Sequence, residues 1–177
     1  MTSGVSSRAT GSRPPRPTQH PALDIIRRKI TELSPDPANA RKHGDKNLQA
    51  IKSSLRRFGQ QKPLVVDGNG VVRAGNGTLA AALDLGWEEV DVVISSLTEA
   101  ELIAYGIADN RSAELAGWDD DVLAALLQCT ADSEKGLEGT GFDEAAMHGL
   151  LEGQEAAKEG DGDLGPKAVC PSCERPL

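Results

Sequence analysis

Residues Gly59 to Gly86 read GQQKPLVVDGNGVVRAGNGTLAAALDLG. Two short apolar runs, Leu64–Val66 and Val71–Val72, flank the turn sequence Asp-Gly-Asn-Gly, which predicts a β-hairpin. The glycine loop Gly75-Asn76-Gly77-Thr78 then opens a helix expected over residues 78–85. The stretch therefore predicts strand, turn, strand and a loop at a helix N-terminus, where free backbone amides favour an anion such as phosphate.

This glycine loop is the first candidate site. We expect Thr78 to cap the helix while the amides after Gly75 point outward, so that the loop holds a phosphate or a carboxylate. The alternative is that the glycines only allow a tight turn and close packing. The loop is not a Walker motif, because no Gly-Lys-Ser or Gly-Lys-Thr follows it.

The segments on both sides of this stretch complete an α/β pattern. Ile25, Ile26, Ile30 and Leu33 predict a short extended segment that ends at the Ser34–Pro37 turn. Apolar residues at three- and four-residue spacing predict an amphipathic helix from Asp45 to Gly59, and Val90–Ile94 predicts another strand. We expect an α/β (α+β) fold with a small mixed sheet flanked by helices.

A helical extension is expected to follow the sheet. Thr98 and Glu101 form a capping-box pattern for a helix over residues 99–108, which we expect to end in a turn at residues 109–111. A further helix is expected from Trp118–Asp120 onward, with Val122, Leu123, Leu126 and Leu127 on one side. A last small helix is expected around Phe142, Met147, Leu150 and Leu151.

The composition and charge distribution predict how the chain divides into segments. The chain has 177 residues and a formal net charge of −8, yet about twelve of its 19 Lys and Arg residues lie before Gln61. We expect a disordered basic arm (1–22), a core (23–97), the helical extension (98–152) and an acidic linker with a cysteine tail (153–177). Such charge polarity can orient a protein on nucleic acid, and the alternative is a solvated basic tail beside an acidic surface.

No stretch approaches the roughly twenty apolar residues of a membrane span, and the N-terminus lacks the apolar core of a secretory signal. The three cysteines give no disulfide framework. We expect a cytoplasmic protein that makes no membrane contact.

Four pieces of the chain occur in the order of a known family. They are the opening ITELSPDPANAR (30–41), the helix LQAIKSSLRRFG (48–59), the strand QKPLVV (61–66) and the loop and helix AGNGTLAAA (74–82). Together they resemble the N-terminal domain of ParB proteins in the ParB/sulfiredoxin superfamily. The segment LTEAELIAYGIADNR (97–111), with Glu114 and Gly117–Asp119, resembles the ParB-like domains of phage and mobile-element proteins found ahead of DNA-modification methyltransferases.

The resemblance implies a nucleotide site at the glycine loop. In ParB the loop is of the Gly-Glu-Arg-Arg type, and its arginines meet the phosphates of CTP. Here the matching positions are Gly75, Asn76, Gly77 and Thr78, so both arginines are missing. Arg41, Lys62 and Arg73 are the candidate donors from nearby segments, with CTP or ATP and Mg²⁺ as candidate ligands.

The resemblance also separates the chain from sulfiredoxin activity. Sulfiredoxin needs a catalytic cysteine in the corresponding loop, and this loop has none. Sulfiredoxin activity is therefore not expected.

A second candidate site is Asp109-Asn110-Arg111 with Glu114 and Asp119. These residues could ligate Mg²⁺ near a phosphate, or Asp109 and Asn110 could cap helices while Arg111 pairs with Glu114. Near the glycine loop, they would serve phosphoryl transfer or DNA nicking.

Cys170 and Cys173 form a Cys-x-x-Cys pair that resembles half of a zinc site. Cys129 and His148, or the pair of a second chain, are candidates for the missing ligands, and the alternative is a tail without metal. We expect His20 and His43 to be solvated, without a catalytic role.

Three function classes remain. The first is a ParB-like, DNA-associated protein of a phage or mobile element that binds a nucleotide or a nucleic-acid phosphate at Gly75–Thr78. The second is an enzyme that hydrolyses nucleotides or nicks DNA, and the third is an accessory module of a DNA methyltransferase. DNA, a methyltransferase and a second copy of the chain are the candidate partners.

Overall fold

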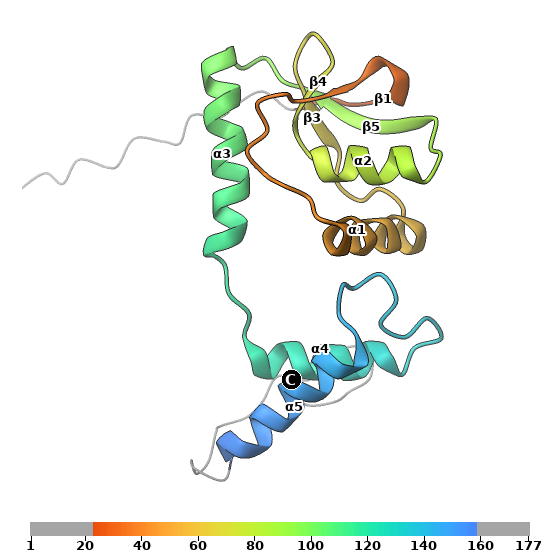
Figure 1. The fold of residues 1–177 in the computed structure, drawn as a ribbon, viewed down its shortest axis with the longest axis vertical. Helices are drawn as coiled ribbons and strands as arrows, with labels where there is room; N and C mark the ends of the chain where they lie inside the picture. The colour runs from red at the N-terminus through yellow and green to blue at the C-terminus, as the bar shows by residue number, and fades with distance from the viewer. Residues whose placement is uncertain (1–22, 159–177) are drawn as a thin grey trace, which may run out of the picture.

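The computed structural model describes residues 23–158, so the expected arm (1–22) and the Cys170/Cys173 pair lie outside the described residues. Figure 1 shows the elements in space. In chain order they are β1 (Ile25–Lys29), the 3₁₀ turn η1 (Ile30–Glu32), β2 (Ser34–Pro35), α1 (Asp45–Phe58), β3 (Leu64–Val66), β4 (Val71–Ala74), α2 (Asn76–Asp84), β5 (Glu89–Ile94), α3 (Glu99–Leu115), α4 (Asp120–Ala131) and α5 (Glu144–Lys158).

The strands form one mixed sheet in the order β1-β5-β3-β4-β2. β1 and β5 are antiparallel, with Ile26 opposite Val92, whereas β3 runs parallel to β5. The predicted hairpin of β3 and β4 is present, closed by Gly70 at φ 81°. Ser34–Pro35, expected as part of a turn, instead pairs in parallel with β4.

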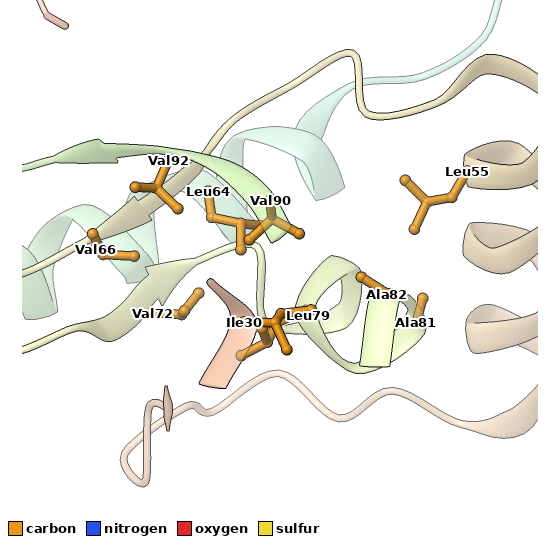
Figure 2. Packing of buried hydrophobic residues seen from close by; sticks show 10 residues of the cluster. All are labelled: Ile30, Leu55, Leu64, Val66, Val72, Leu79, Ala81, Ala82, Val90 and Val92. Carbon is orange, nitrogen blue, oxygen red and sulfur yellow. The ribbon is translucent and has the colours of Figure 1, made fainter. Parts of the chain in front are cut away.

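The main hydrophobic core lies between the sheet and α2. Figure 2 shows Leu64, Val72 and Val92 from the strands packed with Leu79 of α2. α1 covers the other side of α2, so the sheet, α2 and α1 form successive layers (Figure 1). Burial of each such aliphatic side chain contributes about 1.5–3 kcal/mol, which fixes α2 and therefore its N-terminal loop.

α3 is longer than the sequence predicted. Its N-terminus has the expected capping box: Thr98 Oγ1 accepts from the Glu101 amide and Glu101 Oε2 accepts from the Thr98 amide at 2.8 Å. The expected turn at residues 109–111 is wrong, because the helix continues to Leu115. No glycine or proline interrupts residues 107–115, so nothing there stops the helix.

α4 and α5 form a second, smaller hydrophobic cluster of Leu123, Leu127 and Met147 with flanking residues. Leu126, which was expected on the same side, is 42% exposed and is not part of this cluster. The rings of Trp118 and Phe142 meet edge to face, with centroids 6.0 Å apart. The loop after α4 reaches α1, where the Arg57 guanidinium donates to the Gly136 carbonyl at 2.7 Å.

The fold class expected from the sequence is confirmed: a five-stranded mixed sheet is flanked by helices, and helices follow it. Within residues 23–158, no helix combines the length and apolar character needed to cross a bilayer.

Candidate functional site

The glycine loop sits at the N-terminus of α2. Gly75 occupies the N-cap position in the left-handed region, at φ 96° and ψ 22°. The Leu79 amide donates to the Gly75 carbonyl at 2.9 Å as the first intrahelical hydrogen bond of α2. The amides of Asn76, Gly77 and Thr78 precede that bond and are therefore the unpaired first-turn donors that favour an anion.

The helix start corrects one expectation. Thr78 was expected to cap the helix, but α2 begins at Asn76, and Thr78 is its third residue. The N-cap Gly75 has no side chain to offer. The left-handed conformation of Gly75 makes the turn from β4 into α2, so the chain enters the helix two residues earlier than the sequence indicated.

The Asn76 side chain ties the loop to the segment after β2. Its Oδ1 accepts from the Asp36 amide at 3.0 Å, and its Nδ2 donates to the Val72 carbonyl at 2.9 Å. Asn76 therefore acts inward, as a structural link between α2, β4 and residues 36–43. It is not directed to an external phosphate.

Arg73 is also committed to internal contacts. Its Nη2 and Nε donate to Asp67 Oδ2 at 2.8 and 3.0 Å, and its Nη1 donates to Asp36 Oδ2 at 3.1 Å. The hydrogen bond with Asp67 is the main cause of the raised pKa of Arg73. Burial alone would raise the pKa of Asp67, but the amides of Val71 and Asn69 and the Arg73 guanidinium together lower it.

A cleft of about 150 Å³ opens at this loop. It is bounded by the glycine loop, by residues of the segment after β2, by α1 and by α3. Its lining residues are Asn39, Arg41, His43, Ile51, Arg73, Ala74, Gly75, Asn76, Gly77, Thr78, Asp109 and Asn110. Because α3 is continuous through residues 109–111, it brings Asp109 and Asn110 to the glycine loop.

A second groove of about 350 Å³ shares Asn39, Arg41, Arg73 and Asn110 with this cleft. Its other walls are more apolar, with Leu102, Ile103 and Ile107 of α3 along one side. Gly106 allows this close approach of α3 to β4, since a Cβ there would lie 3.2 Å from the Arg73 carbonyl oxygen. A polar and an apolar compartment therefore adjoin.

The other two predicted cationic donors pair with acids of α3. Arg41 binds the Glu114 carboxylate, which also accepts from Arg111 at 3.1 Å. Lys62 lies 3.6 Å from Asp109, is 80% exposed and does not line the cleft. Of the predicted donors, Arg41 and Arg73 therefore line the cleft, each already paired.

The second predicted constellation is partly assembled. Asp109 and Asn110 line the cleft, and the expected pair of Arg111 with Glu114 is present. Asp109 and Asn110 cap no helix, because both lie inside α3; Asn110 Nδ2 instead donates to the Gly106 carbonyl at 2.8 Å. Asp119 caps α4, with Oδ1 accepting from the Val122 amide at 3.1 Å.

No group of three or more His, Cys, Asp or Glu side chains within residues 23–153 is arranged to hold a metal ion by itself. Cys129 and His148, the candidates for completing a zinc site, therefore form no such group with other described side chains. Mg²⁺ often needs only one or two protein carboxylates beside substrate phosphates, so Asp109 stays compatible with such a site.

Sequence reasoning missed two polar residues of the cleft, Asn39 and His43. Asn39 shapes the segment locally, because its Oδ1 accepts from the Arg41 amide at 3.1 Å. His43 was expected to be solvated in a loop, but it is half-buried against Gly77. His43 and Gly77 are 34 positions apart in the sequence, so no local sequence pattern predicts their contact.

Comparisons with known proteins give the family of this chain. No family model matches the chain. The ParB-like nuclease domain-containing protein YnaK of Escherichia coli K12 is 35% identical over 80 residues, which make up 45% of this chain and 92% of that protein. The chain belongs to the ParB-like family.

One further relative and one solved structure are also similar to this chain. The chain is also 30% identical over 95 residues to the chromosome-partitioning protein Spo0J of Thermus thermophilus. The aligned residues make up 51% of this chain and 35% of that protein. Among solved structures, C-terminally truncated ParB from Caulobacter crescentus, complexed with CTP-γ-S, superimposes with a TM-score of 0.59. That alignment covers 77% of this chain and 89% of the other at 17% identity, which establishes the ParB fold.

Proposed function

We propose that this ParB-like chain is a DNA-associated protein that binds a phosphate group, of a nucleotide or of nucleic acid, in the cleft at Gly75–Thr78. One observation carries the proposal: the first-turn amides of α2 lie at a cleft that three other segments enclose. The amides supply donors and the helix dipole supplies a favourable potential.

A nucleoside triphosphate has polar and less polar parts that match the chemical character of the polar cleft and of the apolar groove beside it. The polar cleft offers amides for phosphates, and the more apolar groove beside it offers Leu102 and Ile107 for a base or a sugar. ParB of C. crescentus was solved with CTP-γ-S, which makes CTP the first ligand to test. The relative from T. thermophilus is a chromosome-partitioning protein, which supports a role on DNA.

A second candidate function is metal-dependent phosphoryl transfer or DNA nicking. It is favoured by the position of Asp109 and Asn110 in the same cleft as the amides. A carboxylate and an amide oxygen beside a bound phosphate are the oxygen ligands that Mg²⁺ takes in such sites. Mg²⁺ would supply charge neutralisation there, while the α2 amides hold the phosphate.

A thermal-shift screen tests the binding proposal. The full chain is scanned with CTP, ATP or GTP, each with and without Mg²⁺. A ligand at one hundred times its dissociation constant adds about 2.7 kcal/mol to the free energy of unfolding, which gives a clear rise in Tm. Fluorescence anisotropy with duplex DNA over a salt series tests binding to nucleic acid, whose affinity is expected to fall steeply as the salt concentration rises.

The outcomes separate the candidates. A shift with one nucleotide supports the nucleotide site, and salt-sensitive DNA binding alone supports a nucleic-acid phosphate. No Tm shift together with no DNA binding refutes the proposal. For nicking, the wild type and Asp109→Ala are compared on supercoiled DNA with Mg²⁺; cleavage that persists in Asp109→Ala rejects the catalytic candidate.

A further inference from the structure

The imidazole ring of His43 lies directly against Gly77 in the first turn of α2. A Cβ added to Gly77 would come within 2.7 Å of His43 Cε1 and 2.8 Å of Nδ1, with Ile51 Cδ1 at 3.0 Å behind. The φ of Gly77 is not positive, so its backbone does not itself require glycine. Gly77 is therefore required by the space that the His43 ring occupies.

The orientation of the ring follows from its hydrogen bond. His43 Nδ1 lies 2.8 Å from Asn47 Oδ1 on α1. An amide oxygen only accepts, so Nδ1 carries a proton and donates. The neutral ring then has its lone pair on Nε2, and a second proton at Nε2 makes a cation with a further donor.

His43 differs from the two arginine side chains that line the cleft. Arg73 is held by Asp67 and Asp36, and Arg41 is held by Glu114. The hydrogen bond of His43 goes to the neutral amide of Asn47, and among the described residues no carboxylate pairs with its ring. A positive charge on His43 would therefore be available to an anion in the cleft.

We propose that His43 contacts the bound phosphate, with Gly77 as the complementary residue that seats its ring, and that its protonation sets the affinity. This inference rests on the proposed phosphate site. The loop Gly75–Thr78 has no charged side chain. In this proposal His43, from the segment between β2 and α1, supplies the positive charge. Phosphate binding is then stronger at a lower pH, where a protonated imidazole supplies a positive charge, than at a higher pH.

The charged groups around His43 do not reverse this expectation. The cleft is also lined by Arg41, Arg73 and Asp109, and Lys62 pairs with Asp109. Arginine, lysine and aspartate side chains ordinarily keep their charges between about pH 5.5 and 7.5, so these groups do not themselves produce a pH dependence of affinity there.

Isothermal titration calorimetry with CTP and Mg²⁺ on the full chain tests the inference. Wild type, His43→Gln and the control His148→Gln on the exposed face of α5 are compared at about pH 5.5 and 7.5. Because CTP also titrates, the measured quantity is the affinity ratio of wild type to His43→Gln at each pH. We expect a ratio of about ten at the lower pH that falls toward one at the higher pH. His148→Gln should match wild type at both.

The ring itself gives a second readout. The chain has three histidines, so their imidazole ¹⁵N resonances are assignable by substitution. CTP should shift the His43 resonances, while those of His148 stay in place. If CTP binds but neither the affinity ratio nor the His43 resonances respond, the inference is wrong and the phosphate site stands. If neither CTP nor DNA binds, both proposals fail.

A double-mutant cycle tests the seating of the ring without a ligand. Gly77→Ala should lower Tm, and the loss should shrink when His43 is also changed to Ala, because the colliding ring is gone. Equal losses in both backgrounds would contradict the complementarity of Gly77 and His43. A gain in Tm from Gly77→Ala alone would contradict it as well.

Discussion

The Arg73 guanidinium donates two hydrogen bonds to a single carboxylate oxygen of Asp67, from Nη2 at 2.8 Å and from Nε at 3.0 Å. Asp67 Oδ1 meanwhile accepts from the amides of Asn69 and Val71, which close the hairpin turn. The side chains of both residues are at most 13% exposed. One buried carboxylate therefore holds the hairpin turn and orients the arginine that also reaches Asp36.

The first prediction concerns Asp67→Asn. The asparagine keeps an oxygen for the two turn amides but presents an NH₂ group to Arg73, so the free energy of unfolding should fall by about 2 kcal/mol at pH 7. Urea denaturation measures it. Asp91→Asn, which alters the exposed pair of Arg27 and Asp91, is the matched control and should have a smaller effect.

The pH dependence of the same variant follows from the lowered pKa of Asp67 in the folded protein. Its stabilisation is complete above the ordinary aspartate pKa, about 3.9, and is lost as the pH falls through the lower pKa of the folded state. Asp67→Asn should therefore reduce the slope of stability against pH below about pH 4. An unchanged slope would contradict the assignment.

The sequence predicted the sheet, the hairpin and the α2 loop because these depend on local signals. Apolar alternation, the Asp-Gly-Asn-Gly turn and the capping box of Thr98 and Glu101 act within a few residues. It failed at residues 109–111, where Asp and Asn favour turns in isolation. Tertiary packing of α3 against β4, where Gly106 lies close to the Arg73 backbone, helps to keep α3 helical there.

The cleft itself was beyond local signals. The sequence predicted that the glycine loop opens a helix, as it does in the structure. Whether Arg73 faces a ligand or an internal carboxylate depends on Asp36, which is 37 residues away. Likewise, His43 meets Gly77 because of how α1 packs on α2. Long-range packing decides which polar side chains remain free to contact a ligand. This packing cannot be deduced from the identity of the residues alone.

The second prediction concerns Asn76→Ala. The change leaves the Asp36 amide and the Val72 carbonyl without their Asn76 partner, so stability should fall by about 1–2 kcal/mol. Amide hydrogen exchange should also accelerate in residues 36–43, which Asn76 ties to α2. Asn69→Ala, at an exposed turn position, is the control and should leave exchange in residues 36–43 unchanged. Unaltered exchange in Asn76→Ala would exclude the proposed link.

The third prediction compares two glycines with positive φ. Gly75→Ala places a Cβ 2.6 Å from Leu64 Cδ2 at φ +96°, whereas Gly86→Ala, at φ +72°, meets nothing within 4 Å. Both variants carry the cost of a left-handed alanine, about 1 kcal/mol, and Gly75→Ala adds overpacking of about 1–3 kcal/mol. Thermal and urea denaturation should therefore rank Gly75→Ala as the less stable variant. Equal losses would show that Leu64 moves aside freely.

The fourth prediction concerns Glu114, whose carboxylate binds both Arg41 and Arg111. Glu114→Gln removes the charge that competes with an external anion for Arg41, which lines the cleft. Affinity for duplex DNA or CTP should rise about threefold to tenfold, with a steeper dependence on salt if the ligand is DNA. Anisotropy or calorimetry over a salt series measures this change.

Glu152→Gln on α5 is the control for Glu114→Gln, because it changes the net charge equally at an exposed site remote in sequence from the cleft. If both variants raise affinity alike, overall charge and not Arg41 explains the gain. If only Glu114→Gln does, α3 restrains the cation of the cleft through Glu114, since the release of a paired guanidinium strengthens its contact with an anion. A decrease in affinity would instead mean that Glu114 holds Arg41 in the position that the ligand needs.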